Sequence, residues 1–139
     1  MYQKVSVLII EDEKSICDFI SKTLSSNEYK VTTAANGKDG MALITSSLPD
    51  LVLLDLGLPD MDGVEIIKKT REWSSLPIIV ISARTQEKEK VIALDAGADD
   101  YITKPFGTNE LLARIRTAIR HNNKLVGEGA NTNRPYSAA

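Results

Sequence analysis

A small set of acidic, hydroxyl and amine side chains stands out because each lies at or just beyond the end of an apolar run. The set consists of Glu11, Asp12, Asp55, Ser82 and Lys104. Asp55 is the most informative member, since it follows the run 51–54 and precedes a turn rich in glycine, proline and aspartate. A carboxylate at the end of a buried strand is energetically unfavourable unless it is paired with another group or has a chemical function.

Brought together, these side chains would suit phosphoryl transfer. Three carboxylates in one pocket repel each other, and a hard cation such as Mg²⁺ relieves the repulsion while keeping positions open for phosphate oxygens. A serine hydroxyl and a lysine ammonium can donate to the anion from the other side. An aspartate can carry the phosphoryl group as a mixed anhydride. The set therefore predicts a carboxylate nucleophile that works with Mg²⁺ and a lysine.

Hydrophobic patterning predicts five strands, each followed by a helix. The predicted strands are 5–10, 29–35, 51–55, 77–82 and 100–103. Asn36, Asp62 and Thr85 are predicted N-caps of the second, third and fourth helices, and Gly97 is expected to stop the fourth. A last helix is expected from Thr108 to about residue 121.

This alternation predicts an α/β fold, a five-stranded parallel doubly wound sheet in the order 2-1-3-4-5 with five helices. In that order the first and third strands are neighbours, so Glu11 and Asp12 would face Asp55 at the carboxyl edge of the sheet. The second strand ends in Ala34 and Ala35, which are chemically inert, and it lies at the edge. The five side chains would then converge on one pocket.

Composition is that of an ordinary soluble protein of 139 residues, with 42% apolar and 26% charged residues. The net charge of −2 argues against nucleic acid as a direct partner of this segment. Cys17 is the single cysteine, which excludes an internal disulfide. No signal peptide or membrane-spanning run is recognisable, so the expected location is cytoplasmic, without membrane association.

The motifs together resemble the receiver domain of two-component response regulators. They are Glu11-Asp12, Asp55 with Pro59 and Asp62-Gly63, Ser82-Ala83, the stretch 96–101, and Lys104-Pro105-Phe106. The stretches 55–59, 73–74, 94–101 and 104–107 resemble the winged-helix (OmpR/PhoB-like) subfamily, and within it the potassium-transport (Kdp-type) regulators. The resemblance implies a flavodoxin-like, CheY-like fold.

The resemblance also implies roles at the acidic end of the site. Asp55 would accept the phosphoryl group from a sensor histidine kinase. Asp12 would bind Mg²⁺ directly, with Glu11 close by or acting through water. Gly57 would add its backbone carbonyl as a ligand. The chain would assist its own phosphorylation and dephosphorylation without being an enzyme.

Opposite the acids, the resemblance implies that Ser82 and Lys104 hold phosphoryl oxygens. Tyr101 would swing inward when Ser82 moves. The bond between Lys104 and Pro105 is expected to be cis, an isomer confined almost entirely to bonds before proline. The alternative for Tyr101 is a half-buried strand aromatic without a switching role.

By the same resemblance, phosphorylation would produce a homodimer through the fourth helix, fifth strand and fifth helix. The expected pairs across the two-fold axis are Lys90–Glu110, Asp100–Arg114 and Asp99–Arg120. The alternative is a solvated surface with weak ion pairs.

Other functions share parts of the pattern. An aspartate-nucleophile phosphohydrolase would have a second acid two residues after the nucleophile, where this chain has Gly57. A flavin-binding module of the same topology would have a hydroxyl-rich loop after the first strand. A stand-alone receiver that relays phosphate is a further alternative.

We expect residues 1–121 to form the receiver and 122–139 to be a linker or disordered tail. A DNA-binding domain, if there is one, would lie outside this chain.

Overall fold

Five parallel strands form one sheet in the order β2-β1-β3-β4-β5 in the computed structural model of the chain. The strands are β1 (Ser6–Ile10), β2 (Lys30–Ala34), β3 (Leu51–Leu54), β4 (Ile78–Ser82) and β5 (Asp100–Thr103). The structure describes the backbone of residues 4–132 and the side chains of residues 4–122. The predicted α/β class and strand order are confirmed.

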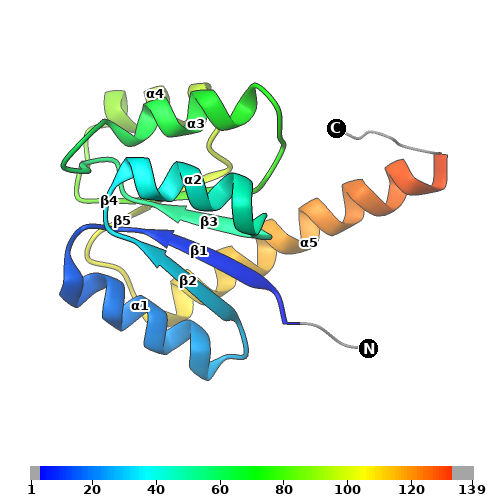
Figure 1. Ribbon diagram of the computed structural model, residues 1–139, viewed down its shortest axis with the longest axis horizontal. Coiled ribbons are helices and arrows are strands. Elements are labelled where there is room, and N and C mark those ends of the chain that lie inside the picture. Colours follow the sequence, from blue (N-terminus) through cyan, green and yellow to red (C-terminus); the bar gives the residue numbers. More distant parts are fainter. Residues whose placement is uncertain (1–3, 133–139) are drawn as a thin grey trace.

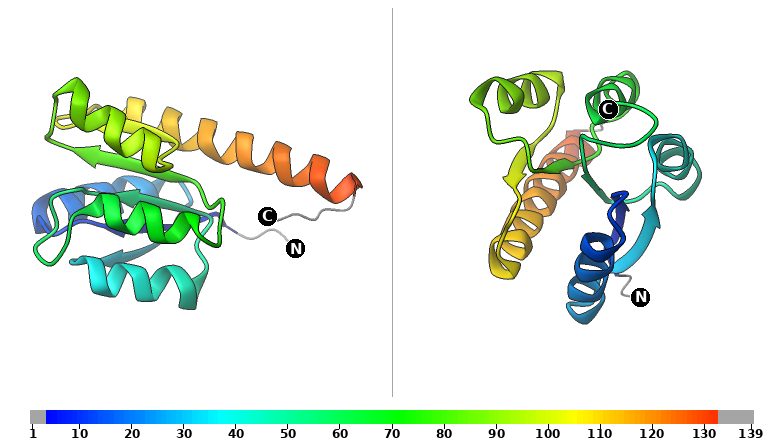
Figure 2. Two further views of the ribbon diagram at one scale, coloured as in Figure 1. Left: turned by 90° about the horizontal axis from the view of Figure 1, so that it is seen from above. Right: turned by 90° about the vertical axis from the view of Figure 1, so that its left-hand side faces the viewer.

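Helices cover both faces of the sheet (Figure 1). They are α1 (Lys14–Ser26), α2 (Gly37–Ser47), α3 (Gly63–Arg71), α4 (Glu87–Ala96) and α5 (Thr108–Thr132). Because strand side chains alternate, Val7 and Ile9 pack with α1 and α5, whereas Leu8 and Ile10 pack with α2, α3 and α4. Figure 2 shows these two layers end-on, with the sheet between them.

Helix ends follow the predicted capping residues with one exception. The Asn36 side chain accepts from Asp39 N, and the Asp62 side chain accepts from Val64 N, so both predicted caps are confirmed. Gly97 ends α4 with a φ of 123°, a backbone conformation that favours glycine. The prediction for Thr85 was wrong, because Gln86 occupies the N-cap position of α4 and makes no side-chain capping bond.

The last helix is longer than its apolar periodicity indicated, since α5 continues to Thr132 and its second half leaves the body of the domain (Figure 1). The periodic positions Leu111, Leu112 and Ile115 are buried against the sheet. The boundary between a receiver at 1–121 and a tail at 122–139 stays a prediction, and residues 133–139 lie outside the described part. Among the described helices, none has the length and apolarity needed to cross a membrane.

Candidate functional site

Three carboxylates meet at the carboxyl edge of the sheet. The parallel register pairs Ile10 of β1 with Leu54 of β3, so the residues that follow these strands lie side by side. Glu11, Asp12 and Asp55 each place a carboxylate oxygen within 4.8 Å of the others. Glu11 and Asp55 are buried, with 3% and 7% of their surfaces exposed, whereas Asp12 is open to solvent.

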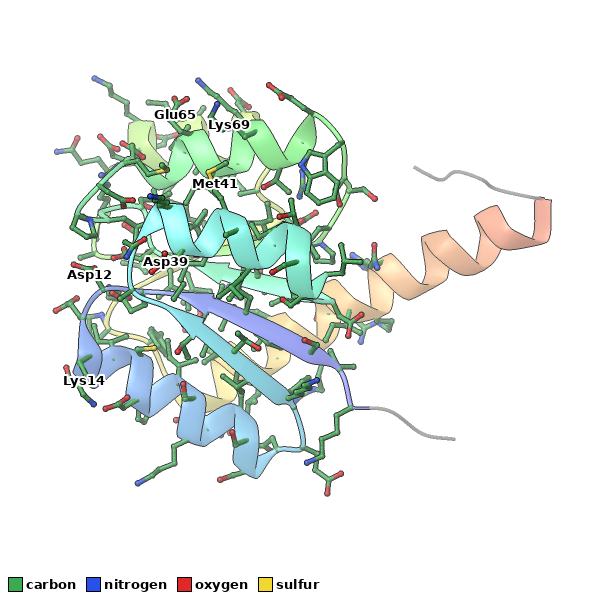
Figure 3. The ribbon with its side chains drawn as sticks, in the orientation of Figure 1. Asp12, Lys14, Asp39, Met41, Glu65 and Lys69 are labelled. Atoms are coloured by element: carbon green, nitrogen blue, oxygen red, sulfur yellow. The ribbon has the colours of Figure 1, made fainter. Side chains whose placement is uncertain are left out.

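Asp12 lies at the end of β1, at the same edge of the molecule as the first turn of α2 with Asp39 (Figure 3). This is the edge at which ligands bind in open parallel sheets.

Lys104 reaches into this cluster from the end of β5. Its Nζ lies 2.9 Å from Glu11 Oε1, 3.2 Å from Glu13 Oε1 and 3.8 Å from Asp55 Oδ1. The bond between Lys104 and Pro105 is cis, as predicted. Glu13 was missed at the sequence level, although it is the third acid of the run that begins at Glu11.

Burial and charge oppose each other at these groups. Burial raises the pKa of Asp55, and the charge of Lys104 and the Gly57 amide only partly offset it. Burial likewise raises the pKa of Glu11 against the hydrogen bond from Lys104. For Lys104, burial alone would lower the pKa, but the hydrogen bond to Glu11 and the charges of Glu11 and Asp55 outweigh burial, so the pKa is raised. The pocket thus favours a bound positive charge.

Ser82 and Tyr101 are connected through the backbone of one loop residue. The amide of Arg84 donates to Ser82 Oγ at 3.0 Å, and the Tyr101 hydroxyl donates to the Arg84 carbonyl at 2.8 Å. Ser82 is buried, and Tyr101 is half-buried. Arg84 was not singled out from the sequence, and its position two residues after Ser82 is the signal that could have found it.

Gly57 lies in the loop between Asp55 and α3. Its amide approaches Asp55 Oδ1 at 3.4 Å, and an isolated antiparallel bridge pairs it with Asp62. A Cβ added to Gly57 would meet nothing within 4 Å. There is therefore room for the second acid of a phosphohydrolase, but the chain has no side chain there.

The donor set suits a hard divalent cation. The three clustered ligand atoms are all carboxylate oxygens, which Mg²⁺ prefers over nitrogen or sulfur. One of the three residues, Asp12, is exposed, which leaves a path for a hydrated ion. The residues present therefore fit the expected Mg²⁺.

Four of the six charged residues of the expected dimer face, Asp99, Asp100, Glu110 and Arg114, pair within the chain. Arg114 contacts Asp100 at 3.2 Å and Glu110 at 3.5 Å, and Asp99 contacts Arg71 at 3.0 Å. The Lys90 ammonium lies 5.8 Å from the centre of the Tyr101 ring. Arg120 is exposed on α5.

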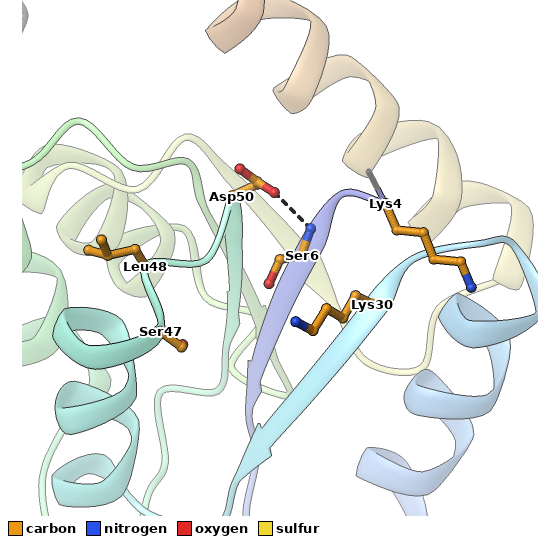
Figure 4. A pocket seen from close by; sticks show the side chains of 6 residues that line it. All are labelled: Lys4, Ser6, Lys30, Ser47, Leu48 and Asp50. Carbon is orange, nitrogen blue, oxygen red and sulfur yellow. Dashed lines mark hydrogen bonds between the residues drawn. The ribbon is translucent and has the colours of Figure 1, made fainter. Parts of the chain in front are cut away.

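A hollow lies at the opposite, amino-terminal edge of the sheet (Figure 4). Its lining consists of Lys4, Ser6, Lys30, Ser47, Leu48 and Asp50. Asp50 accepts a hydrogen bond from Ser6 N at 2.8 Å, and most of the lining is exposed. No lining side chain is both buried and polar, in contrast to Glu11 and Asp55 at the acidic edge.

The fold and the acidic edge agree with a known family. The model of the response regulator receiver domain matches residues 7–116, and the chain belongs to this family, the phosphorylation-switched domain of two-component signalling.

Among curated proteins, the chain is similar to the KDP operon transcriptional regulatory protein KdpE of Escherichia coli, with 50% identity over 115 residues. That match covers 83% of this chain and 51% of KdpE, so the chain spans about half the length of this relative. The expected likeness to OmpR/PhoB-like regulators of the Kdp type is confirmed.

Solved structures agree. A CheY-like receiver domain protein from Methanospirillum hungatei has a TM-score of 0.84 at 31% identity, covering 88% of this chain and 98% of that one. The BeF3-activated receiver domain of Klebsiella pneumoniae RstA has a TM-score of 0.79 at 30% identity, covering 83% and 98%.

Proposed function

We propose that Asp55 is the phosphoacceptor of this receiver and that a sensor histidine kinase supplies the phosphoryl group. The observation that carries the proposal is the cluster of Glu11, Asp12 and Asp55 with the Lys104 ammonium at its edge. Such a site combines a carboxylate nucleophile with the positive charge that a transferring phosphoryl group needs.

The chemistry follows from the position of Asp55. One of its carboxylate oxygens attacks the phosphorus of a phosphohistidine, so that a P–O bond forms and the P–N bond breaks. The released imidazole nitrogen takes up a proton. Lys104, already 3.8 Å from Asp55 Oδ1, is close enough to turn toward a phosphoryl oxygen. The chain thus assists its own phosphorylation and later hydrolysis.

Asp12, Glu11, Asp55 and the Gly57 carbonyl would hold Mg²⁺. When bound, the ion neutralises charge on the transferring phosphoryl oxygens. The exposed Asp12 is the first of these side chains that an entering ion meets.

The signal would leave the site through Ser82 and Tyr101. By likeness to the family, Ser82 Oγ would lie next to the phosphoryl group. In this chain it accepts a hydrogen bond from the Arg84 amide. A hydroxyl drawn toward a phosphoryl oxygen would shift this loop and release the Tyr101 hydroxyl from the Arg84 carbonyl. Phosphorylation would shift a pre-existing equilibrium between two loop arrangements.

The proposed output is a homodimer through α4, β5 and α5, with the pairs Lys90–Glu110, Asp100–Arg114 and Asp99–Arg120. Arg114 and Asp99 would exchange their present partners within the chain for partners across the axis. KdpE is described as a transcriptional regulator, and by that likeness DNA binding would belong to a domain outside this chain. The proposed location is cytoplasmic.

Sedimentation with Mg²⁺, with and without beryllofluoride, tests acceptor and dimer together. Wild type is expected to dimerise only with the phosphoryl mimic, and acetyl phosphate is expected to add one phosphoryl mass. Asp55→Asn should do neither. Asp18→Asn, which removes an exposed carboxylate on α1, is the matched control and should behave like wild type. A mass gain in Asp55→Asn would refute the acceptor assignment.

A further inference from the structure

The loop that follows Asp55 is anchored to α2 by a single carboxylate, that of Asp60. Asp60 Oδ1 accepts from Gly37 N at 2.7 Å, and its Oδ2 accepts from Lys38 N at 2.9 Å. These are the first two amides of α2, which lack partners inside the helix. The side chain of the helix's own cap, Asn36, accepts from the third amide, Asp39 N, at 2.8 Å. Asp60 and Asn36 therefore divide the capping of one helix between two segments.

A second contact joins the same two segments. The Met61 side chain occupies the space where a Cβ on Gly37 would lie, since that atom would come within 2.5 Å of Met61 Cγ. The glycine thus allows the loop to approach the helix closely. Hydrogen bonds from the Gly37 and Lys38 amides to Asp60, together with packing by Met61, fix the loop against α2.

The other end of this loop is fixed by α3. Asp62 caps α3 through Val64 N at 2.9 Å and also pairs with Gly57 in the isolated bridge. Gly57 itself approaches Asp55 Oδ1 through its amide. The backbone between Asp55 and α3 is consequently held at both sides, and Asp60 supplies the side that faces α2.

We propose that Asp60 is a positioning residue that orients the Gly57 carbonyl toward the cation and keeps the Asp55 carboxylate facing Glu11. This inference rests on the proposed function. Asp60 is not a member of the clustered acids, and its carboxylate oxygens are bonded to the amides of α2, so its effect would pass through the backbone. Groups that hydrogen-bond directly to a metal ligand typically change metal affinity by about 10- to 100-fold, and a residue that acts through the backbone is expected at the lower end of that range.

The charge of Asp60 suits this role. The amides of Gly37 and Lys38 lower the pKa of Asp60, so the side chain is a carboxylate at neutral pH. A negative charge at the start of α2 is also favoured by the helix dipole.

Mg²⁺ affinity in Asp60→Ala and Asn36→Ala separates positioning from helix capping. Both variants lose capping of α2, and both should lower the thermal midpoint by a similar amount, about 2–8 °C. We expect the Mg²⁺ dissociation constant, followed through the Gly57 amide by NMR, to rise about tenfold in Asp60→Ala and to change less than twofold in Asn36→Ala. Asp60→Asn keeps one acceptor oxygen, so its Mg²⁺ dissociation constant should lie between those of wild type and Asp60→Ala. This variant also covers the case in which Asp60→Ala does not fold.

Equal Mg²⁺ constants in the Asp60 variants and wild type would overturn the inference while leaving the phosphoacceptor proposal intact. An equal loss of affinity in the Asp60 and Asn36 variants would also overturn it, because the effect would then belong to α2. If wild type itself binds no Mg²⁺ and gains no phosphoryl group, the proposed function fails instead.

Discussion

The helices α3 and α4 flank the same site but are held in different ways. Of the nine residues of α3, Gly63, Val64, Ile66, Ile67 and Thr70 are buried, whereas α4 buries Ala93 alone among its ten residues. Val91, Ile92 and Leu94 of α4 are each more than 40% exposed. Core packing therefore holds α3, which follows the loop after Asp55. It does much less to hold α4, which would carry the signal.

Because α4 has few buried apolar side chains, polar contacts at its two ends help to hold it against the domain. Arg71 donates through Nε to the carbonyl of Gly97 at 2.9 Å, and Arg84 contacts Glu89 at 3.4 Å near the first turn. Such contacts can be exchanged at little net cost, whereas a packed core resists displacement. Of the two helices, α4 is therefore the one that a rearrangement at Ser82 can move.

The largest expected difference between the two helices is in core stability. Ile67→Ala on α3 should lower the free energy of unfolding by about 3 kcal/mol, because the side chain is fully buried and leaves a cavity. Ile92→Ala on α4, at 43% exposure, should change it by less than about 0.5 kcal/mol. Urea unfolding measures both, and similar losses would remove the distinction.

A smaller effect is expected at the C-terminal end of α4. Arg71 also contacts Asp99 at 3.0 Å and the carbonyl of Ser74 at 3.2 Å, and its side chain is 22% exposed. Arg71→Ala should lower stability by about 2 kcal/mol, the scale for hydrogen bonds to a charged group. Amide hydrogen exchange should accelerate in α4 more than in α3.

Arg71→Lys serves as the control for charge, since a single ammonium cannot reproduce three separate nitrogen contacts. It should recover only part of the protection in α4. Full recovery would mean that charge, and not the geometry of the guanidinium, holds the helix.

At the first turn of α4 the expected effect is weaker still. Arg84→Ala removes contacts at 3.4 Å to Asp62 and Glu89, all from partly exposed side chains. The loss should be about 0.5 kcal/mol and should shrink with added salt. Because Tyr101 bonds the backbone of Arg84, its hydroxyl contact should survive the substitution. A loss of 2 kcal/mol or more in urea unfolding would show that the side chain, too, is essential to α4.

The smallest effect should appear on the acceptor side at low pH. The pKa of Asp60 is lowered in the folded chain. The contribution of its carboxylate to folding stability is therefore complete above the pKa of the unfolded chain, about 3.9, and is lost as the pH falls through the pKa of the folded chain. The Gly37 and Lys38 amide resonances should report this titration below pH of about 3.9. Asp60→Asn should abolish it, and a titration above that pH would contradict the assignment.

Much of the site was predictable because parallel strands deliver their last residues to one edge. Glu11, Asp55, Ser82 and Lys104 each lie at or just beyond the end of a strand that the apolar pattern reveals, and the order 2-1-3-4-5 places these strand ends at one edge of the sheet. The preference of Lys104 for Glu11 over Asp55 was not predictable, since a long flexible side chain selects among several acids only in the folded pocket.

Contacts that lie off the periodic pattern were also missed. Asp60 reaches Gly37 and Arg71 reaches Gly97 across 23 and 26 residues, and neither pair shares a strand or a helical face. The extension of α5 to Thr132 was missed for a related reason. Apolar residues recur at helical spacing where a helix packs against the sheet. The part of α5 that extends beyond the sheet therefore shows no such pattern.

The three clustered carboxylates and the Lys104 ammonium have a consequence for how far the signal can travel as an electric field. Together they leave two uncompensated negative charges, which one divalent cation would cancel, while Glu13, which also contacts Lys104, adds one more at the exposed rim. An acyl phosphate on Asp55 would then add about one negative charge to a site of small net charge. Water and salt would screen so small an increment within about 8 Å. A distant surface would therefore sense phosphorylation through displaced atoms, not through altered potential.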